Sequence, residues 1–320
     1  MTRWRGVVGL GVALLVLCIA IGADQKKDPA KSKPESQDYT IRTTSRLVLL
    51  DVSVKDPKGG FIAGLKKDNF KVFENGKQQE ISEFADADIP VTVGLAVDES
   101  GSMSPKRTEV IAAALAFIQS SNPQDEVFVI NFNEKARRGL PEIQLFSDNV
   151  DQLKAALWRG RAEGRTALYD AIEMGLQQLN MGRRDKKTLV VISDGGDNVS
   201  VHKFRDVMND VLASLTTIYT IGIFDQDDPD RNPGVLKQLS QVSGGEAFFP
   251  QTLEEVTPIC QQIAKDIRTR YTIGYIPSEE GGKGVRHIKV AAANENGQRL
   301  NVRTRTGYIY TPDTEMADRK

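Results

Sequence analysis

Cysteine is scarce in this chain of 320 residues, which contains only Cys18 and Cys260. Cys18 falls in an N-terminal apolar segment that we expect to be removed, which would leave Cys260 alone in the mature chain. A single thiol excludes an intramolecular disulfide as a support for the fold. Because Cys260 lies in an apolar helical pattern, we interpret it as a small buried side chain rather than a nucleophile.

An excess of charge of either sign is also lacking, since the chain has 42 basic and 43 acidic residues. This balance gives no electrostatic case for nucleic acid as a partner. G-x-G-x-x-G and P-loop patterns are absent from the α/β region, which argues against nucleotide binding. The only two histidines, His202 and His287, fall in different predicted domains, so no Ser-His-Asp arrangement is visible.

Charge is absent altogether from residues 7–23, which follow two arginines. Small residues near the end of this run have the spacing that signal peptidase requires. We therefore predict that residues 1–23 are a signal peptide and that the protein is exported to the periplasm or the extracellular space. Two alternatives remain open, an uncleaved membrane anchor and lipid attachment at Cys18. Contact with a membrane is expected only if the segment is retained.

Large apolar residues are missing from residues 24–38, a stretch rich in Lys, Asp, Pro and Ser. Such a segment cannot bury enough surface to offset the entropy of ordering it, so we predict a disordered linker. Residues 312–320 are similarly polar, and we predict a disordered tail there.

Short alternating strands are predicted in residues 39–89, where Asn75-Gly76 is a strong hairpin signal. One continuous strand is expected over residues 78–84. The segment is too short to form a β-sandwich by itself. Residues 271–311 show four more strand patterns, so we expect these two segments to form one β domain, with an α/β domain at residues 90–270 inserted between them.

The inserted domain alternates apolar strands with amphipathic helices, which predicts a doubly wound, mostly parallel six-stranded α/β sheet. Its central strand is the almost purely apolar run at residues 91–97. The expected strands are residues 91–97, 127–132, 144–146, 188–193, 218–224 and 247–249. The expected helices are residues 106–121, 150–158, 166–179, 203–215, 235–242 and 253–270.

Oxygen-bearing side chains follow two of these strands and open one helix. Asp98, Ser100 and Ser102 come after the central strand, Thr166 opens a helix, and Asp194 follows the strand at residues 188–193. Loops at the carboxyl edge of a doubly wound sheet converge at its switch point, so we expect the five side chains to meet. Hard oxygen donors of this kind suit Mg²⁺, Mn²⁺ or Ca²⁺. The alternative is that these residues merely cap the following helices.

The same residues carry a resemblance to a known family. The combination of DESGSM at 98–103, RTALYDA at 165–171 and ISDGGDN at 192–198 resembles the von Willebrand factor type A (vWA) family and its metal-ion-dependent adhesion site. The resemblance implies direct coordination by Ser100, Ser102 and Thr166, with Asp98 and Asp194 acting directly or through water. Arg165 departs from the pattern, because a glycine often precedes the threonine, and it would place a cation close to the metal.

The flanking segments are similar to an exported bacterial VWFA-related family described from Acidobacteria. The similarity is carried by DNFKVFENGKQQEISEF at 68–84 and RTRTGYIY at 303–310. The resemblance implies a protein that binds a partner through the metal ion, with a Glu or Asp carboxylate of the partner completing the coordination, in adhesion or envelope-complex assembly.

An enzyme is not expected, because the predicted site has no adjacent general base and no second metal. The alternatives are a metal-dependent hydrolase and a scaffold whose metal is purely structural. The acidic loop at residues 225–230 is interpreted as solvated rather than as a second cation site, since its spacing is not that of an EF-hand.

Overall fold

The computed structural model describes residues 47–224, 230–278 and 283–310. The predicted signal peptide, linker and tail lie outside the described residues, as do five of the six residues of the acidic loop. Among the described residues, no helix is both long and apolar enough to span a bilayer.

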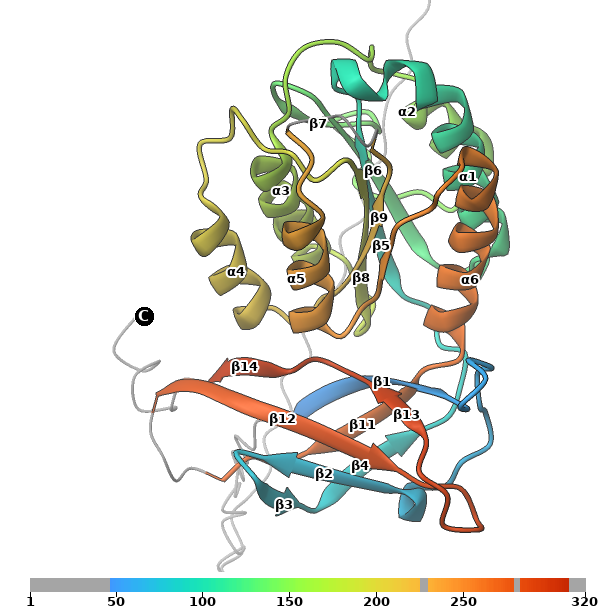
Figure 1. Ribbon diagram of the computed structural model, residues 1–320, viewed down its shortest axis with the longest axis vertical. Coiled ribbons are helices and arrows are strands. Elements are labelled where there is room, and N and C mark those ends of the chain that lie inside the picture. Colours follow the sequence, from blue (N-terminus) through green and yellow to red (C-terminus); the bar gives the residue numbers. More distant parts are fainter. Residues whose placement is uncertain (1–46, 225–229, 279–282, 311–320) are drawn as a thin grey trace, which may run out of the picture. The chain divides into compact units, whose positions relative to one another are not determined.

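A six-stranded sheet forms the centre of the inserted domain (Figure 1). Its strand order is β10-β9-β8-β5-β6-β7, and every neighbouring pair is parallel except β6 and β7. The fold class predicted from the sequence is therefore confirmed. The strands are β5 (Thr92–Asp98), β6 (Glu126–Phe132), β7 (Ala136–Arg138), β8 (Lys187–Ser193), β9 (Thr217–Gly222) and β10 (Ala247–Phe248).

Helices cover both faces of this sheet, with α3, α4 and α5 on one face and α1 and α6 on the other (Figure 1). The α-helices are α1 (Arg107–Ser120), α2 (Val150–Leu157), α3 (Leu168–Asn180), α4 (Phe204–Ala213), α5 (Pro233–Ser243) and α6 (Val256–Arg268). Short 3₁₀ helices are η1 (Lys67–Asn69), η2 (Gly101–Lys106) and η3 (Leu253–Glu255).

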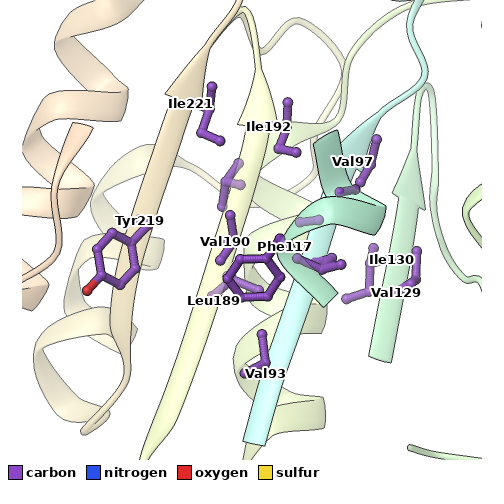
Figure 2. Close-up of a cluster of buried hydrophobic side chains, with 14 of the residues drawn as sticks. Val93, Val97, Phe117, Val129, Ile130, Leu189, Val190, Ile192, Tyr219 and Ile221 are labelled. Carbon is purple, nitrogen blue, oxygen red and sulfur yellow. The ribbon is translucent and has the colours of Figure 1, made fainter. Parts of the chain in front are cut away.

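The core of the α/β domain is built on the central strand β5, all seven residues of which are buried. Figure 2 shows Val93 and Val97 of β5 among side chains of the neighbouring strands, with Phe117 of α1 beside them. Burying one such side chain contributes about 1.5–3 kcal/mol to stability. A strand that is apolar along its whole length is therefore most stable at the centre of the sheet, where both of its faces are covered. Cys260 of α6 is buried in the same core, and this burial raises the pKa of its thiol to about 12.

The predicted edge strand at residues 144–146 is wrong. The edge of the sheet is β7, a short strand that turns back antiparallel onto β6. The nearest strand-like contact of the predicted segment is a single bridge between Val127 and Ser147. Leu145 and Phe146 are half-buried, and Phe146 packs on the core against the ring of Phe128, which explains the apolar character of this segment without a strand.

Two four-stranded sheets build the β domain, in the orders β13-β1-β11-β4 and β14-β12-β2-β3. Each sheet combines strands from before and after the α/β domain, and one apolar cluster lies between them. The strands are β1 (Val48–Lys55), β2 (Phe70–Glu74), β3 (Lys77–Gln79), β4 (Ile81–Ala85), β11 (Tyr271–Tyr275), β12 (Gly284–Ala292), β13 (Asn301–Arg303) and β14 (Gly307–Tyr310).

The hairpin signal Asn75-Gly76 does join β2 to β3, and both residues have positive φ, at 48° and 83°. These values match the tight turn that Asn-Gly favours between antiparallel strands. The single strand expected over residues 78–84 is instead two strands in different sheets. The chain leaves β3 after Gln79 and pairs as β4 with β11.

A buried polar cluster lies where α6 and β9 meet the β domain. The carboxylate of Asp266 accepts hydrogen bonds from Ser53 and Tyr219, each at 2.5 Å, and pairs with Arg270 and Arg303. Asp266 is 2 % exposed. Burial raises its pKa, but the two arginines outweigh burial and hold the pKa below its usual value.

Candidate metal centre

The first carboxylate of the candidate centre, Asp98, is fixed at the end of β5. Its Oδ1 accepts a hydrogen bond from the Ser100 amide at 2.8 Å, which turns the chain sharply after the strand. Its Oδ2 accepts from the Ser193 hydroxyl of the adjacent strand β8 at 2.6 Å. Both carboxylate oxygens are thus oriented by neighbouring groups, and the side chain is 3 % exposed.

A chain of hydrogen bonds runs from this turn to the second carboxylate. The hydroxyls of Ser100 and Ser102 lie 3.1 Å apart, and Ser102 Oγ donates to Asp194 Oδ2 at 2.6 Å. The other oxygen of Asp194 accepts from the Gly196 amide at 3.0 Å. Parallel pairing of β5 with β8 therefore brings the two predicted ligand loops into direct contact.

Thr166 lies in the segment between α2 and α3 and lines the same cavity as Ser100, Ser102 and Asp194. The Thr166 amide donates to Asn198 Oδ1, and the Asn198 amide donates to the Thr166 carbonyl, both at 3.0 Å. The Gly101 amide donates to the Gly164 carbonyl at 3.0 Å, which ties this segment to the turn after β5 as well. Thr166 is 5 % exposed.

These loops surround an open cavity of about 280 Å³. Its lining comprises Ser100, Ser102, Gly164, Arg165, Thr166, Asp194, Asn198 and Asp230. Four of the five residues predicted from the sequence line the cavity, and the fifth, Asp98, is buried and hydrogen bonded to the amide of Ser100. Arg165 is exposed and lines the cavity, as its position next to Thr166 led us to expect. Asp230 is the one residue of the predicted acidic loop that the structure describes.

The start of α3 is held by side chains of the segment that follows Asp194. The helix has no capping side chain of its own, because its N-cap is Ala167. Instead, Asp197 Oδ1 accepts from the Tyr169 amide at 3.1 Å, and Ser200 Oγ accepts from the Asp170 amide at 3.1 Å. In return the Asp170 carboxylate accepts from the His202 amide and ring, at 3.0 Å and 2.7 Å. These contacts provide acceptors for the first backbone amides of α3, which have no hydrogen-bond partner within the helix.

The electrostatics of the site favour a cation. Burial, together with the nearby carboxylate of Asp194, raises the pKa of Asp98 to about 7. Two apposed carboxylates in a poorly solvated place repel each other, and a divalent ion would relieve this repulsion. The available donors are all carboxylate or hydroxyl oxygens, which fit Mg²⁺, Mn²⁺ or Ca²⁺ and not a thiolate or imidazole metal. Across the part of the chain that the structure describes, no group of three His, Cys, Asp or Glu side chains could hold a metal.

Two supporting residues were missed by the sequence analysis. Glu99, which is 2 % exposed, accepts from Arg107 at 3.0 Å, and the same guanidinium donates to the Gly160 carbonyl at 2.6 Å. A Cβ on Gly160 would lie 1.4 Å from Glu99 Oε2, so any larger residue there would have to displace the Glu99 carboxylate from its present position. Asn198 was visible in the ISDGGDN run, but its partner Thr166 is 32 residues away in sequence. Glu99 offered no signal, since a carboxylate after a strand is usually solvated.

Comparison with known proteins agrees with this architecture. A protein of Synechocystis sp., "Uncharacterized protein sll0103", is 27% identical over 198 residues, and the match spans 58% of this chain and 45% of that protein. This chain therefore matches less than half the length of that relative. Among solved structures, a von Willebrand factor type A protein from Catenulispora acidiphila matches with a TM-score of 0.50 at 13% identity, covering 86% of this chain and 76% of that one.

The vWF domain of the type V pili tip protein Mfa5 from Porphyromonas gingivalis matches with a TM-score of 0.45 at 13% identity, covering 56% of this chain and 95% of that one. The family described as von Willebrand factor type A domain matches residues 93–263, more than half of the sequence. The chain belongs to the von Willebrand factor type A domain family.

Proposed function

We propose that this is an exported protein whose vWA domain binds a partner protein through one divalent cation, with a Glu or Asp carboxylate of the partner completing the coordination. vWA domains commonly mediate protein–protein interaction or adhesion, so membership of the family supports a binding role. One observation supports a bound metal above all others. Hydrogen bonds link Asp98 through Ser100 and Ser102 to Asp194, and Ser100, Ser102, Asp194 and Thr166 line one open cavity. Export is supported by the uncharged N-terminal run that follows two arginines.

Five residues would hold the ion. Ser100, Ser102 and Thr166 would supply neutral oxygens, and Asp98 and Asp194 would balance the charge directly or through water. When bound, the ion would act as a Lewis acid with a position left for an outside oxygen, because Mg²⁺ prefers six ligands. Because three of the five ligands would be neutral hydroxyls, the ion would remain a strong enough Lewis acid to take a partner carboxylate as its sixth ligand.

Binding without turnover is favoured over hydrolysis. Among the described residues that line the cavity there is no histidine, lysine or tyrosine to serve as a general base; of its two carboxylates, Asp194 would be engaged by the ion and Asp230 accepts a hydrogen bond from Asn198 at 3.3 Å. The nearest histidine in the sequence after Asp194 is His202, whose Nδ1 is hydrogen bonded to Asp170 Oδ1 at 2.7 Å. A hydrolase would show metal-dependent cleavage of a generic ester or peptide, and a purely structural metal would leave partner affinity unchanged by EDTA.

Thermal unfolding with Mg²⁺ and with EDTA tests the metal. An ion that binds only the folded state stabilises it by about 2.7 kcal/mol at a hundredfold excess over Kd. We expect a Mg²⁺-induced rise in Tm for the wild type and none for Asp194→Ala. Asp148→Ala is the matched control, because Asp148 is an exposed carboxylate outside the cavity. Equal shifts in wild type and Asp194→Ala would contradict the proposal.

A pull-down from the same cell envelope tests the binding role. We expect one or more proteins to be retained by the wild type in Mg²⁺ and released by EDTA, and Asp194→Ala to retain none of them. Retention that survives both EDTA and Asp194→Ala would place docking elsewhere on the protein.

A further inference from the structure

A cluster of basic side chains borders the candidate metal centre. Residues 134–138 and 158–165 together carry six basic and two acidic side chains, and we call these two segments the basic rim. The basic side chains are all exposed, namely Lys135, Arg137, Arg138, Arg159, Arg161 and Arg165. Because the whole chain has a net charge of only −1, this excess is local.

Hydrogen bonds and close contacts join the two segments of the basic rim. Arg159 Nη1 donates to the Gly139 carbonyl at 3.0 Å, immediately after β7. A Cβ on Gly164 would lie 3.0 Å from Glu134 Cγ, so these residues are direct neighbours. The rim therefore runs from the sheet edge at β7 to the cavity, which Arg165 lines.

Much of the positive charge of the basic rim has no acidic partner among the residues that the structure describes. In the described part of the chain, none of the four residues Lys135, Arg138, Arg161 and Arg165 forms an ion pair with an acidic side chain. The other charged residues that line the cavity, Asp194 and Asp230, are both acidic. Among the described residues, the surroundings of the candidate centre are thus asymmetric in charge, with exposed basic side chains on one side of the cavity and carboxylates on the other.

We propose that the basic rim recognises a run of acidic residues in the partner, next to the carboxylate that reaches the metal. The inference rests on the proposed function. A single carboxylate–metal contact gives little selectivity, whereas several long basic side chains can attract an acidic segment and fix its direction across the site. Exposed charges act over roughly 8 Å at physiological ionic strength, so the acidic residues must lie close to the coordinating carboxylate in the partner sequence.

Two fluorescein-labelled peptides of equal length test the inference with the full chain. One has a single Asp within Gly and Ser residues, and the other has the same Asp flanked on both sides by Glu. In Mg²⁺ we expect the acid-flanked peptide to bind about tenfold more tightly, because several opposite charges meet at the surface. Raising the salt concentration from about 50 mM to about 300 mM should remove most of that advantage.

Variants then locate the effect. Arg138→Gln with Arg161→Gln should reduce the advantage of the acid-flanked peptide by at least about threefold. Lys71→Gln with Lys289→Gln is the matched control, since these exposed lysines of β2 and β12 remove the same charge from the β domain. The control should keep the full wild-type advantage.

The possible failures are distinguishable. Equal Mg²⁺-dependent affinities for the two peptides, or no binding of the acid-flanked peptide in Mg²⁺, would overturn the inference about the basic rim. An acid-flanked peptide that binds equally well in EDTA would instead count against the proposed metal-dependent function. Tighter binding of a single-stranded oligonucleotide or of anionic phospholipid vesicles than of the acid-flanked peptide would assign the rim to another class of partner and also overturn the inference.

Discussion

Thr166 and Asn198 exchange two hydrogen bonds, each 3.0 Å long, and so lock together the two loops that carry a predicted hydroxyl ligand and a predicted carboxylate ligand. The Asn198 side chain accepts from one backbone and its own backbone donates in return. Such a reciprocal pair fixes the spacing between the loops before any ion binds. A site held in this way loses little conformational entropy when the metal is coordinated.

Replacing Asn198 should therefore weaken metal binding without unfolding the domain. Asn198→Ala removes the acceptor for the Thr166 amide, and the loss of one such hydrogen bond costs about 1 kcal/mol, or roughly fivefold in affinity. Isothermal titration with Mg²⁺ measures the change. Asn209→Ala on α4 removes an exposed amide elsewhere and should leave the affinity unchanged. Wild-type affinity in Asn198→Ala would show that Thr166 is positioned by other contacts.

The affinity for Mg²⁺ should rise with pH up to about 7. The pKa of Asp98 is raised to about 7 in the metal-free protein by burial and by Asp194, so below that pH a proton competes with the ion. Each unit of pH below 7 should weaken binding by up to about tenfold. Titrations at pH 5, 6, 7 and 8 measure this dependence. A flat profile across that range would mean that Asp98 is already ionised without metal.

The same shift has a consequence for stability in EDTA. Because folding raises the pKa of Asp98 from 3.8 to about 7, the folded state holds the proton more tightly than the unfolded state. Its contribution to the free energy of unfolding is greatest below pH 3.8 and declines as the pH rises towards 7. Asp98→Asn should abolish this part of the pH dependence, and thermal melts in EDTA at several pH values would detect it.

His202 should stabilise the protein most when it is protonated. Its hydrogen bond to Asp170 raises the pKa of the imidazole above 6.5, so the folded state favours the charged ring. The stabilisation is fully present below the unfolded pKa of 6.5 and is lost as the pH rises through the higher folded pKa. His202→Gln should thus lower Tm more at pH 6 than at pH 9. His287→Gln in the β domain serves as the control, and an equal loss at both pH values would contradict the prediction.

Buried apolar strands were predictable because their pattern is set by the core itself. β5 has side chains packed on both faces, so its sequence is apolar throughout and identifies the centre of the sheet. The edge strand β7 has the sequence Ala-Arg-Arg and pairs only through its backbone. The sequence of β7 therefore does not predict a strand. The apolar residues Leu145 and Phe146 favoured a strand at the wrong place. Residues 77–85 are divided between two sheets because β3 pairs with β2 and β4 pairs with β11. Such pairing between segments distant in sequence cannot be read from the local pattern.

The candidate ligands were predictable for a different reason, since each follows a recognisable strand or opens a helix at one edge of the sheet. The supporting contacts were not. Asn198 accepts from the amide of Thr166, 32 residues earlier in the sequence. Glu99 accepts from Arg107, whose guanidinium also donates to the distant Gly160 carbonyl. Hydrogen bonds to distant backbone groups leave no periodic signal in a single sequence.

Removing the carboxylate of Asp266 should destabilise the protein strongly. In Asp266→Ala the buried guanidinium of Arg270 would lose a partner that now lies 3.4 Å away, and Arg303 would lose the same partner. Breaking a buried ion pair on one side costs about 3–5 kcal/mol, because the remaining charge stays desolvated and unpaired. Urea denaturation followed by circular dichroism measures the loss. Glu254→Ala, which removes an exposed carboxylate near the start of α6, should have little effect. Since Asp266 also receives hydrogen bonds from Ser53 of β1 and Tyr219 of β9, a small effect would mean that other contacts between the two domains, such as the ion pairs of Glu246 with Lys55 and Arg303, are sufficient to hold this junction.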